Sequence, residues 1–331
     1  MELHTAFLAD ASGRASRLAR RRQSGPGTFA LYGYFRGPAL PQRPRIEARP
    51  EGWCWGVPIP DGTYNALVFL DPARVRGAGR KSLDELLKGL LEGSALGRDL
   101  VGAELVRPVR AADATPYVDE ACVGPTRIRV GDAALALDPL SSSGVQKAIQ
   151  TALSGAIVAN TLLRRPEASL FASAFHRGAV ERAAERHRAW SSEHYATGMS
   201  ANRYDGAFWR ARAAAAPTAA APRPLDLPAV DCPLRFSAEA AWRDVPCLGE
   251  AFVEVQRALE HPRLDGPIAY LGGHSLTRLL EGAPDGWSAR DYVRAWSKTM
   301  APDAAASIAR WLLMRGVLEP SAEPRLRGDA D

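Results

Sequence analysis

Residues 127–148 read R-I-R-V-G-D-A-A-L-A-L-D-P-L-S-S-S-G-V-Q-K-A. The stretch begins as a short buried strand that ends at Gly131, where the missing Cβ lets the backbone approach a ligand closely. Asp132 follows at the carboxyl end of this strand, the edge at which α/β sheets place ligands. Ser143 and Gly144 then open a helix, so free N–H groups and the positive end of the helix dipole meet at one place. The stretch predicts an α/β fold with a ligand site at the strand end.

The residue types indicate which ligand this site takes. The carboxylate of Asp132 can accept hydrogen bonds from the hydroxyl groups of a ribityl or ribose chain. Pro139 fixes the backbone ahead of Ser142, and the helix start suits an anion, a phosphate or the electron-rich edge of a reduced flavin. The alternative is a strand, a turn and a capped helix without a ligand. The tight spacing of Gly-Asp, Asp-Pro and Ser-Gly favours the ligand site.

The rest of the chain predicts a sheet and several helices. Strands are predicted at 3–9, 29–35, 52–59 and 64–70, the last three in one antiparallel sheet. Asp61-Gly62 is a hairpin signal, and Ser82 with Glu85 forms a capping box at a helix start. Further helices are predicted from Gly144 to about 163, over 167–195, and as short helices between 268 and 320. In the last range, Ser288 with Asp291 and Pro302-Asp303 indicate two helix starts.

Composition excludes several classes of protein. Eight Trp residues and a hydrophobic fraction of 46% supply apolar surface for a core, which excludes a wholly disordered chain. The longest apolar stretch, 152–163, is shorter than the ~20 residues of a membrane span, and the N-terminus lacks signal-peptide features. We therefore expect a cytoplasmic protein without a membrane partner. The net charge of +5 comes from scattered Arg residues rather than a stripe, so we expect no nucleic-acid partner.

Neither the histidines nor the cysteines predict a metal site. His176, His187 and His194 share one helical stripe, but seven residues of helix rise about 10 Å, too far for shared ligands of one ion. The four cysteines are far apart in the sequence and form no C-x-x-C pair.

Three motifs carry a resemblance to a known family. The motif at 131–144, with Gly-Asp, Asp-Pro-Leu and Ser-Gly, resembles the second FAD fingerprint of flavin-dependent monooxygenases and halogenases. Residues 10–16, D-A-S-G-R-A-S, resemble the middle motif of that family, in which a strand ends in Asp. Residues 53–58, W-C-W-G-V-P, are similar to the W-x-W-x-[Ile/Val]-P pattern of flavin-dependent halogenases. Tyr195, Arg203, Phe208 and Trp209 resemble the segment that follows in these proteins.

The resemblance implies FAD as the cofactor and gives roles to particular residues. Asp132 would hold the ribityl chain, and the loop from Pro139 to the helix start would lie against the isoalloxazine ring. Trp53 and Trp55 would line the flavin, although alternate residues of a strand share a face and both could also be core. The implied cofactor-binding residues are Asp10, Trp53, Trp55, Gly131, Asp132, Pro139, Ser142, Ser143 and Gly144. No residue is singled out as a catalytic acid or base.

The implied fold is α/β, of the FAD/NAD(P)-binding, two-dinucleotide-binding type. This fold is completed by an antiparallel-sheet substrate domain and a helical C-terminal module. A winged-helix-like form is one option for this module. The expected parts are an FAD-binding part (1–28), the substrate sheet and helix (29–105), a second FAD-binding part (106–165), a helical segment (166–210), an Ala/Pro-rich linker (211–233) and the C-terminal module (234–331).

Two features depart from the family pattern. No G-x-G-x-x-G occurs in the sequence, and Gly77-Ala78-Gly79 lacks the third Gly. The chain is therefore expected to be the carboxyl-terminal part of such an enzyme, without the halogenase lysine. In addition, Ser141 stands where tryptophan halogenases carry Glu. This makes 138–148 more similar to flavoproteins that modify Trp residues during maturation of quinone-cofactor enzymes.

The resemblance implies a FAD-dependent oxidoreductase, and a monooxygenase first of all. Reduced flavin would capture O2 and deliver an oxygen atom to an aromatic small molecule or to a protein-bound Trp. A flavin reductase or NAD(P)H would supply electrons. Two alternatives stay open. The Trp motif favours a halogenase, and the missing phosphate loop favours a non-catalytic, partner-binding fragment.

Overall fold

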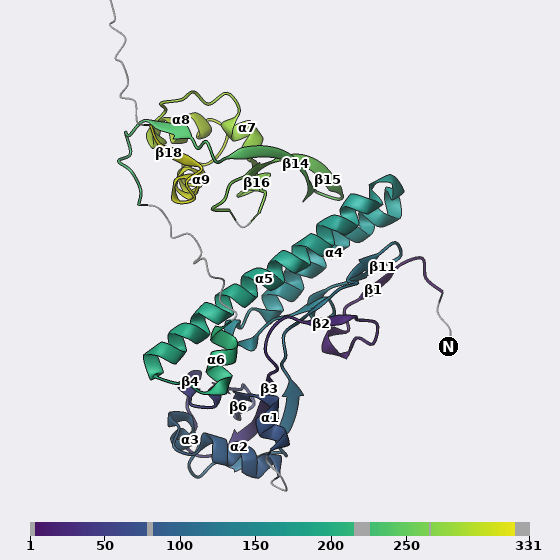
Figure 1. Ribbon diagram of the computed structural model, residues 1–331, viewed down its shortest axis with the longest axis vertical. Helices are drawn as coiled ribbons and strands as arrows, with labels where there is room; N and C mark the ends of the chain where they lie inside the picture. Colours follow the sequence, from purple (N-terminus) through teal and green to yellow (C-terminus); the bar gives the residue numbers. More distant parts are fainter. Residues whose placement is uncertain (1–3, 78–81, 215–225, 265, 322–331) are drawn as a thin grey trace, which may run out of the picture. The chain divides into compact units, whose positions relative to one another are not determined.

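The computed structural model describes residues 4–77, 82–214, 226–264 and 266–321, and the chain divides into two compact units (Figure 1). Unit 1 spans 1–217 and unit 2 spans 218–331. The division falls within the range 211–233 that was expected to be a linker.

A six-stranded antiparallel sheet forms the centre of unit 1. The three predicted strands are confirmed as β3 (Phe29–Arg36), β5 (Gly52–Pro58) and β6 (Tyr64–Leu70). Gly62, in the predicted hairpin between the last two, has φ +80°, which a glycine adopts without strain. The strand order is β4-β5-β6-β3-β7, and β8 also pairs with β3. The added strands are β4 (Arg45–Arg49), β7 (Glu104–Leu105) and β8 (Arg110–Asp113).

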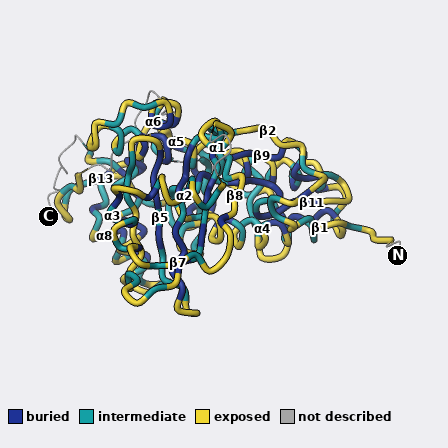
Figure 2. Tube along the Cα trace, turned by 90° about the horizontal axis from the view of Figure 1, so that it is seen from below, coloured by how far each residue is buried: buried dark blue, intermediate teal, exposed yellow. Residues whose placement is uncertain are grey.

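The two faces of this sheet have different roles, because successive side chains point to opposite sides. One face packs against α2 (Leu83–Leu91), which starts at the predicted capping box of Ser82. Its core includes Leu31, Cys54, Val68, Leu70 and Leu87. Buried residues follow β5 through the middle of Figure 2. The opposite face carries Trp53, Trp55, Leu67 and Phe69, which residues of the helical segment partly cover.

A short parallel pair places two motif ends side by side. β1 (Leu8–Asp10) pairs with β11 (Arg127–Arg129), which also pairs with β10 (Val123–Gly124). Of the strand predicted at 3–9, residue 3 lies outside the described residues and residues 4–7 are not strand. The observed strand covers 8–10, because its pairing begins where β11 begins, with Leu8 opposite Arg127. Parallel strands end at the same edge, so Asp10, the last residue of β1, lies beside the end of β11, after which the chain continues to Gly131. A second small sheet contains β2 (Arg21–Gln23), β9 (Tyr117–Asp119) and β12 (Leu135–Ala136).

Two long helices lie side by side over these strands (Figure 1). Helix α4 (Gly144–Arg164) has nearly the predicted bounds, and Gly155 lets it approach the sheet, since a Cβ there would lie 2.7 Å from Val130 Cγ1. Helix α5 (Ser169–Asn202) continues seven residues beyond the predicted end. The last helix of the unit, α6 (Ala207–Ala213), includes 211–213, so the linker prediction is wrong there: Arg212 is buried. Two short helices are α1 (Pro72–Arg76) and α3 (Ala95–Asp99).

Unit 2 has its own core and is not purely helical. The predicted helix starts are confirmed at α8 (Ala289–Trp296), with the capping box of Ser288 and Asp291, and at α9 (Pro302–Met314). The prediction of a helical module is incomplete, because β14 (Ala241–Leu248) pairs along its full length with β15 (Val253–Glu260). The remaining elements are α7 (Leu276–Leu280), β13 (Leu234–Phe236), β16 (Tyr270–Leu271), β17 (His274–Ser275) and β18 (Leu318–Pro320). A winged-helix-like arrangement stays a prediction.

Within the described ranges, no cluster of three or more His, Cys, Asp or Glu side chains is arranged to hold a metal ion. None of the helices in the described part of the chain is both long enough and apolar enough to cross a membrane.

Candidate cofactor and substrate site

The chain turns at Gly131 shortly after β11 ends, as the sequence predicted. Gly131 has φ +60°, and its N–H donates a hydrogen bond of 2.8 Å to Thr151 Oγ1 of α4. A Cβ at this glycine would lie 3.5 Å from the Cβ of Ala148, so the positive φ, rather than space, favours glycine here. A short 3-10 turn over Gly131–Ala133 follows and carries Asp132.

A buried lysine holds Asp132. Lys147 Nζ lies 2.6 Å from Asp132 Oδ1 and also donates to the carbonyl of Leu135. Arg14 Nε lies 3.7 Å from Asp132 Oδ2. Burial lowers the pKa of Lys147, although its bond to Asp132 acts in the opposite direction. The Asp132 side chain keeps 36% of its surface exposed, so its orientation is set and it can still accept further hydrogen bonds.

Asp10 is bonded within its own loop. Its carboxylate accepts hydrogen bonds of 2.6 Å from the hydroxyl groups of Ser12 and Ser16. Burial raises the pKa of Asp10, but these hydrogen bonds and the nearby Arg129 outweigh it and lower the pKa overall. The predicted contact of Asp10 with the cofactor stays a prediction.

The loop before α4 leaves the start of that helix open. A 3-10 turn over Pro139–Ser141 leads to Ser142, which adopts the left-handed conformation with φ 53°. The Ser143 hydroxyl donates to the carbonyl of Ser141 at 3.0 Å and does not cap the helix. The first N–H groups of α4 are therefore not covered by the Ser143 side chain, as a site for an electron-rich group requires.

Two motifs far apart in the sequence meet at one cavity. This aromatic cavity has a volume of about 420 Å3 and is lined on the sheet side by Trp53, Trp55 and Phe69, and on the loop side by Pro139, Leu140 and Ser142. Trp53 stacks on Phe69 with ring centroids 4.0 Å apart. Trp53 is buried and Trp55 half-buried, so Trp53 is both a core residue and a cavity wall.

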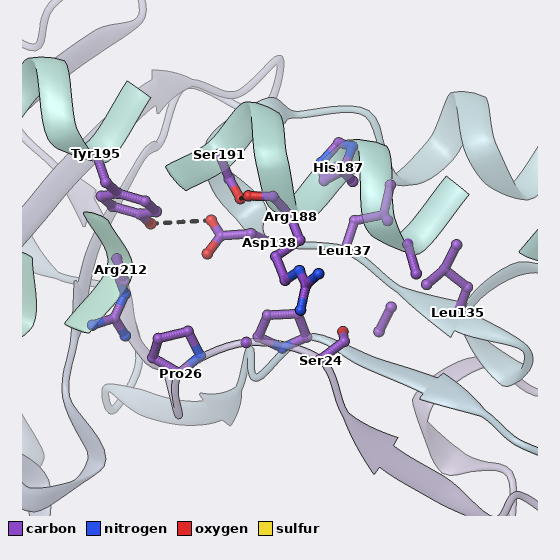
Figure 3. A pocket seen from close by; sticks show the side chains of 14 residues that line it. Ser24, Pro26, Leu135, Leu137, Asp138, His187, Arg188, Ser191, Tyr195 and Arg212 are labelled. Atoms are coloured by element: carbon purple, nitrogen blue, oxygen red, sulfur yellow. Dashed lines mark hydrogen bonds between the residues drawn. The ribbon is translucent and has the colours of Figure 1, made fainter. Parts of the chain in front are cut away.

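Sequence reasoning missed a buried polar cluster beneath the loop (Figure 3). Asp138 Oδ1 accepts hydrogen bonds from Leu140 N at 2.9 Å and from the Tyr195 hydroxyl at 3.0 Å. Burial raises the pKa of Asp138. A second cavity of about 20 Å3, enough for about one water molecule, is lined by Asp138, Tyr195, His187 and Arg212 among others. The Asp-Pro pair was the available signal, since an Asp before Pro can cap a turn through its side chain.

The three histidines of α5 have three different environments. His187 Nε2 lies 2.6 Å from the hydroxyl of Ser141, and burial lowers the pKa of this histidine. His176 is buried against the carbonyl of Arg129, and His194 is exposed and stacks on Trp190. Ser141, which occupies the position of a Glu in the resemblance, therefore has a histidine as its partner.

Solved structures define the class of protein. The chain matches the peptidyl tryptophan dihydroxylase QhpG, essential for tryptophylquinone cofactor biogenesis, at 27% identity and a TM-score of 0.70, over 95% of this chain and 70% of that chain. It matches CmlS, a flavin-dependent halogenase, at 18% identity and a TM-score of 0.74, over 94% of this chain and 68% of the other. The fold is thus the α/β, FAD-binding fold of halogenase-like flavoenzymes, as predicted.

The family follows from the sequence comparison. The tryptophan halogenase family model matches residues 28–229, and the chain belongs to this family. Relatives include tryptophan 2-halogenase of Chondromyces crocatus, 31% identical over 47% of this chain and 33% of the relative. Another is the flavin-dependent halogenase rdc2 of Metacordyceps chlamydosporia, 26% identical over 53% of this chain and 38% of the relative. The chain spans about a third of the length of these relatives. The cofactor of the family is FAD, which confirms that prediction.

Proposed function

We propose that this chain forms the ring-side half of the site of a FAD-dependent monooxygenase that hydroxylates an aromatic substrate. The observation that carries the proposal is the aromatic cavity, where Trp53 and Trp55 face the loop Pro139–Ser142. Similarity to a peptidyl tryptophan dihydroxylase supports a Trp side chain of a peptide or protein as the substrate. A flavin reductase or NAD(P)H would supply the electrons.

The residues present fit one half of FAD. The open start of α4, the half-exposed Asp132 and the aromatic walls suit an electron-rich ring edge, a hydroxyl-bearing chain and a flat ring, respectively. The sequence contains no G-x-G-x-x-G, which is the usual partner of the diphosphate. The proposal is therefore limited to the isoalloxazine and ribityl parts of the cofactor.

Each residue of the site has a physical task. Asp132, oriented by Lys147, would accept hydrogen bonds from the ribityl hydroxyls. The N-terminal dipole of α4 would favour negative charge on the ring edge. Trp53 and Trp55 would exclude water from the reacting groups, which strengthens electrostatic interactions there. FAD, when bound, supplies the activation of O2.

Halogenation is the second candidate. The W-x-W-x-V-P motif and the halogenase relatives favour it. The Ser141–His187 pair, at the position where the resemblance places a Glu, favours hydroxylation. Mass spectrometry of a Trp-containing peptide, incubated with the chain, FAD, NADH, a flavin reductase and O2 with or without chloride, separates the two. Product that gains oxygen without chloride supports the proposal, and product that forms only with chloride supports halogenation.

The first test is a titration of the purified 331-residue chain with FAD, followed by visible absorbance and flavin fluorescence. The proposal expects saturable binding and a shifted flavin spectrum. A chain that stays colourless and leaves the spectrum of free FAD unchanged would overturn the proposal for this polypeptide and favour a partner-binding fragment.

Replacing Asp132 with Asn is expected to weaken FAD binding about tenfold or more, because a hydrogen bond to a charged group contributes ~1.5–3 kcal/mol. The matched control is Glu120→Gln, which removes an exposed carboxylate paired only loosely with Arg22 at 3.4 Å. Fluorescence titration of both variants measures the effect. Equal affinity of the two variants would show that Asp132 does not contact the cofactor.

A further inference from the structure

A chain of buried hydrogen bonds joins the two walls of the aromatic cavity. Trp53 Nε1–H donates to the Tyr195 hydroxyl at 3.2 Å, and this hydroxyl donates to Asp138 Oδ1 at 3.0 Å. The same oxygen accepts the N–H of Leu140 at 2.9 Å. Trp53 lies in the sheet wall and Leu140 in the loop wall. One carboxylate oxygen therefore connects both sides of the cavity, through a tyrosine of α5.

We propose that Tyr195 and Asp138 are positioning residues that hold the Trp53 ring and the loop Pro139–Ser142 at a fixed distance from each other across the cavity. This inference rests on the proposed function, in which these two walls hold the flavin ring and the aromatic substrate. Neither Tyr195 nor Asp138 lines the aromatic cavity, so both act through the residues that do.

Only one orientation of the Trp53 ring gives its indole N–H the Tyr195 hydroxyl as a hydrogen-bond acceptor. An indole has one donor, and a buried N–H without an acceptor is costly, so a flipped Trp53 ring would lose its partner. The Tyr195 hydroxyl accepts this N–H and donates its own proton onward, which fixes the direction of both bonds. Tyr195 is 1% exposed and Asp138 6% exposed, so both partners are shielded from bulk water.

Titratable side chains of α6 and of α5 itself face the cluster. Arg212 of α6 bonds to the Thr28 hydroxyl at 2.6 Å and lies over the ring of Phe208, with 3.6 Å to its centroid. His187 of α5 lines the small cavity beside Asp138. The attraction of Arg212 and the hydrogen bonds favour the charged carboxylate, while burial favours the neutral one and raises the pKa of Asp138 overall. In either protonation state, the oxygen that receives the Tyr195 hydroxyl keeps its place.

The test is an NMR spectrum of the full chain, without cofactor, carrying 15N in the indole groups of its eight Trp residues. The Trp53 signal is assigned by its loss in Trp53→Phe. In Tyr195→Phe we expect this signal to shift and its proton to exchange with water at least tenfold faster, while the exposed Trp190 signal stays in place. Asp138→Asn retains a carbonyl acceptor for Tyr195 and is expected to preserve slow exchange, whereas Asp138→Ala is expected to lose it.

The control is Tyr204→Phe, which removes a hydroxyl from the same aromatic cluster, where it makes only a 3.4 Å bond to the carbonyl of Ala48. A Trp53 signal that responds equally to both Tyr variants, or to neither, would overturn the inference. If the Tyr195→Phe variant does not fold, the indole proton exchange rates of the unmodified chain test the inference instead. A Trp53 proton that exchanges with water as fast as the Trp190 proton would overturn it. Because no cofactor is added, this result is independent of the FAD titration, which tests the proposed function alone.

Discussion

Replacing Arg129 with methionine is expected to lower the free energy of unfolding by about 3–5 kcal/mol, the cost of leaving one member of a buried ion pair alone. The Arg129 side chain is 2% exposed and bonds directly to Asp119, whose side chain is fully buried. It also donates to the carbonyl groups of Leu18 and, at 2.6 Å, Ala121. Methionine keeps most of the side-chain volume, so the loss of stability measures the contribution of the charge and its hydrogen bonds.

The matched control for this prediction is Arg127→Met on the same strand, where the side chain is exposed and little change is expected. Urea denaturation followed by circular dichroism measures both variants. The prediction fails if the two variants unfold at the same urea concentration. Because Arg129 connects the elements around the parallel pair β1–β11, its loss should also weaken FAD binding through displacement of the strand ends that carry Asp10 and Asp132.

Trp53→Ala is expected to cost about 3–5 kcal/mol of stability, the usual range for a large aromatic residue removed from a core. Trp53 is 4% exposed, stacks on Phe69 and donates to Tyr195. Trp55→Ala is expected to cost less than about 2 kcal/mol, because Trp55 is already half-buried at the cavity. For ligand binding, Trp55→Ala is expected to lower FAD affinity while the fold persists.

Thermal and urea unfolding of both variants, together with FAD titration of Trp55→Ala, distinguish a residue of the core from a residue that lines the cofactor site. Equal stability losses for the two variants would show that both tryptophans are ordinary core residues. An unchanged FAD affinity in Trp55→Ala would show that the half-buried ring does not line the cofactor site.

Local signals predicted several elements of both units well. The strands at 29–35 and 64–70, the capping box of Ser82 and the helix start at Ser288 were found because each depends on residues close in sequence. The hairpin β14–β15 was missed, although V-E-V-Q-R-A-L-E at 253–260 begins with the alternation of a strand. The end of α5 was also misplaced, because its last turns are stabilised by contacts with α6 rather than by a local signal.

The sequence by itself determined the α/β class and the two motifs that face each other, because residue types at short spacing set strand ends, turns and helix starts. The FAD cofactor followed from the resemblance of these motifs to those of a known family. Only the tertiary structure decided that Trp53 and the loop Pro139–Ser142 enclose one cavity, and that Tyr195 and Asp138 connect its walls. Trp53 and Tyr195 are 142 residues apart, and no local pattern encodes such a pair. Their contact results from the packing of α5 on the sheet, where a buried donor finds its acceptor only after the chain has folded.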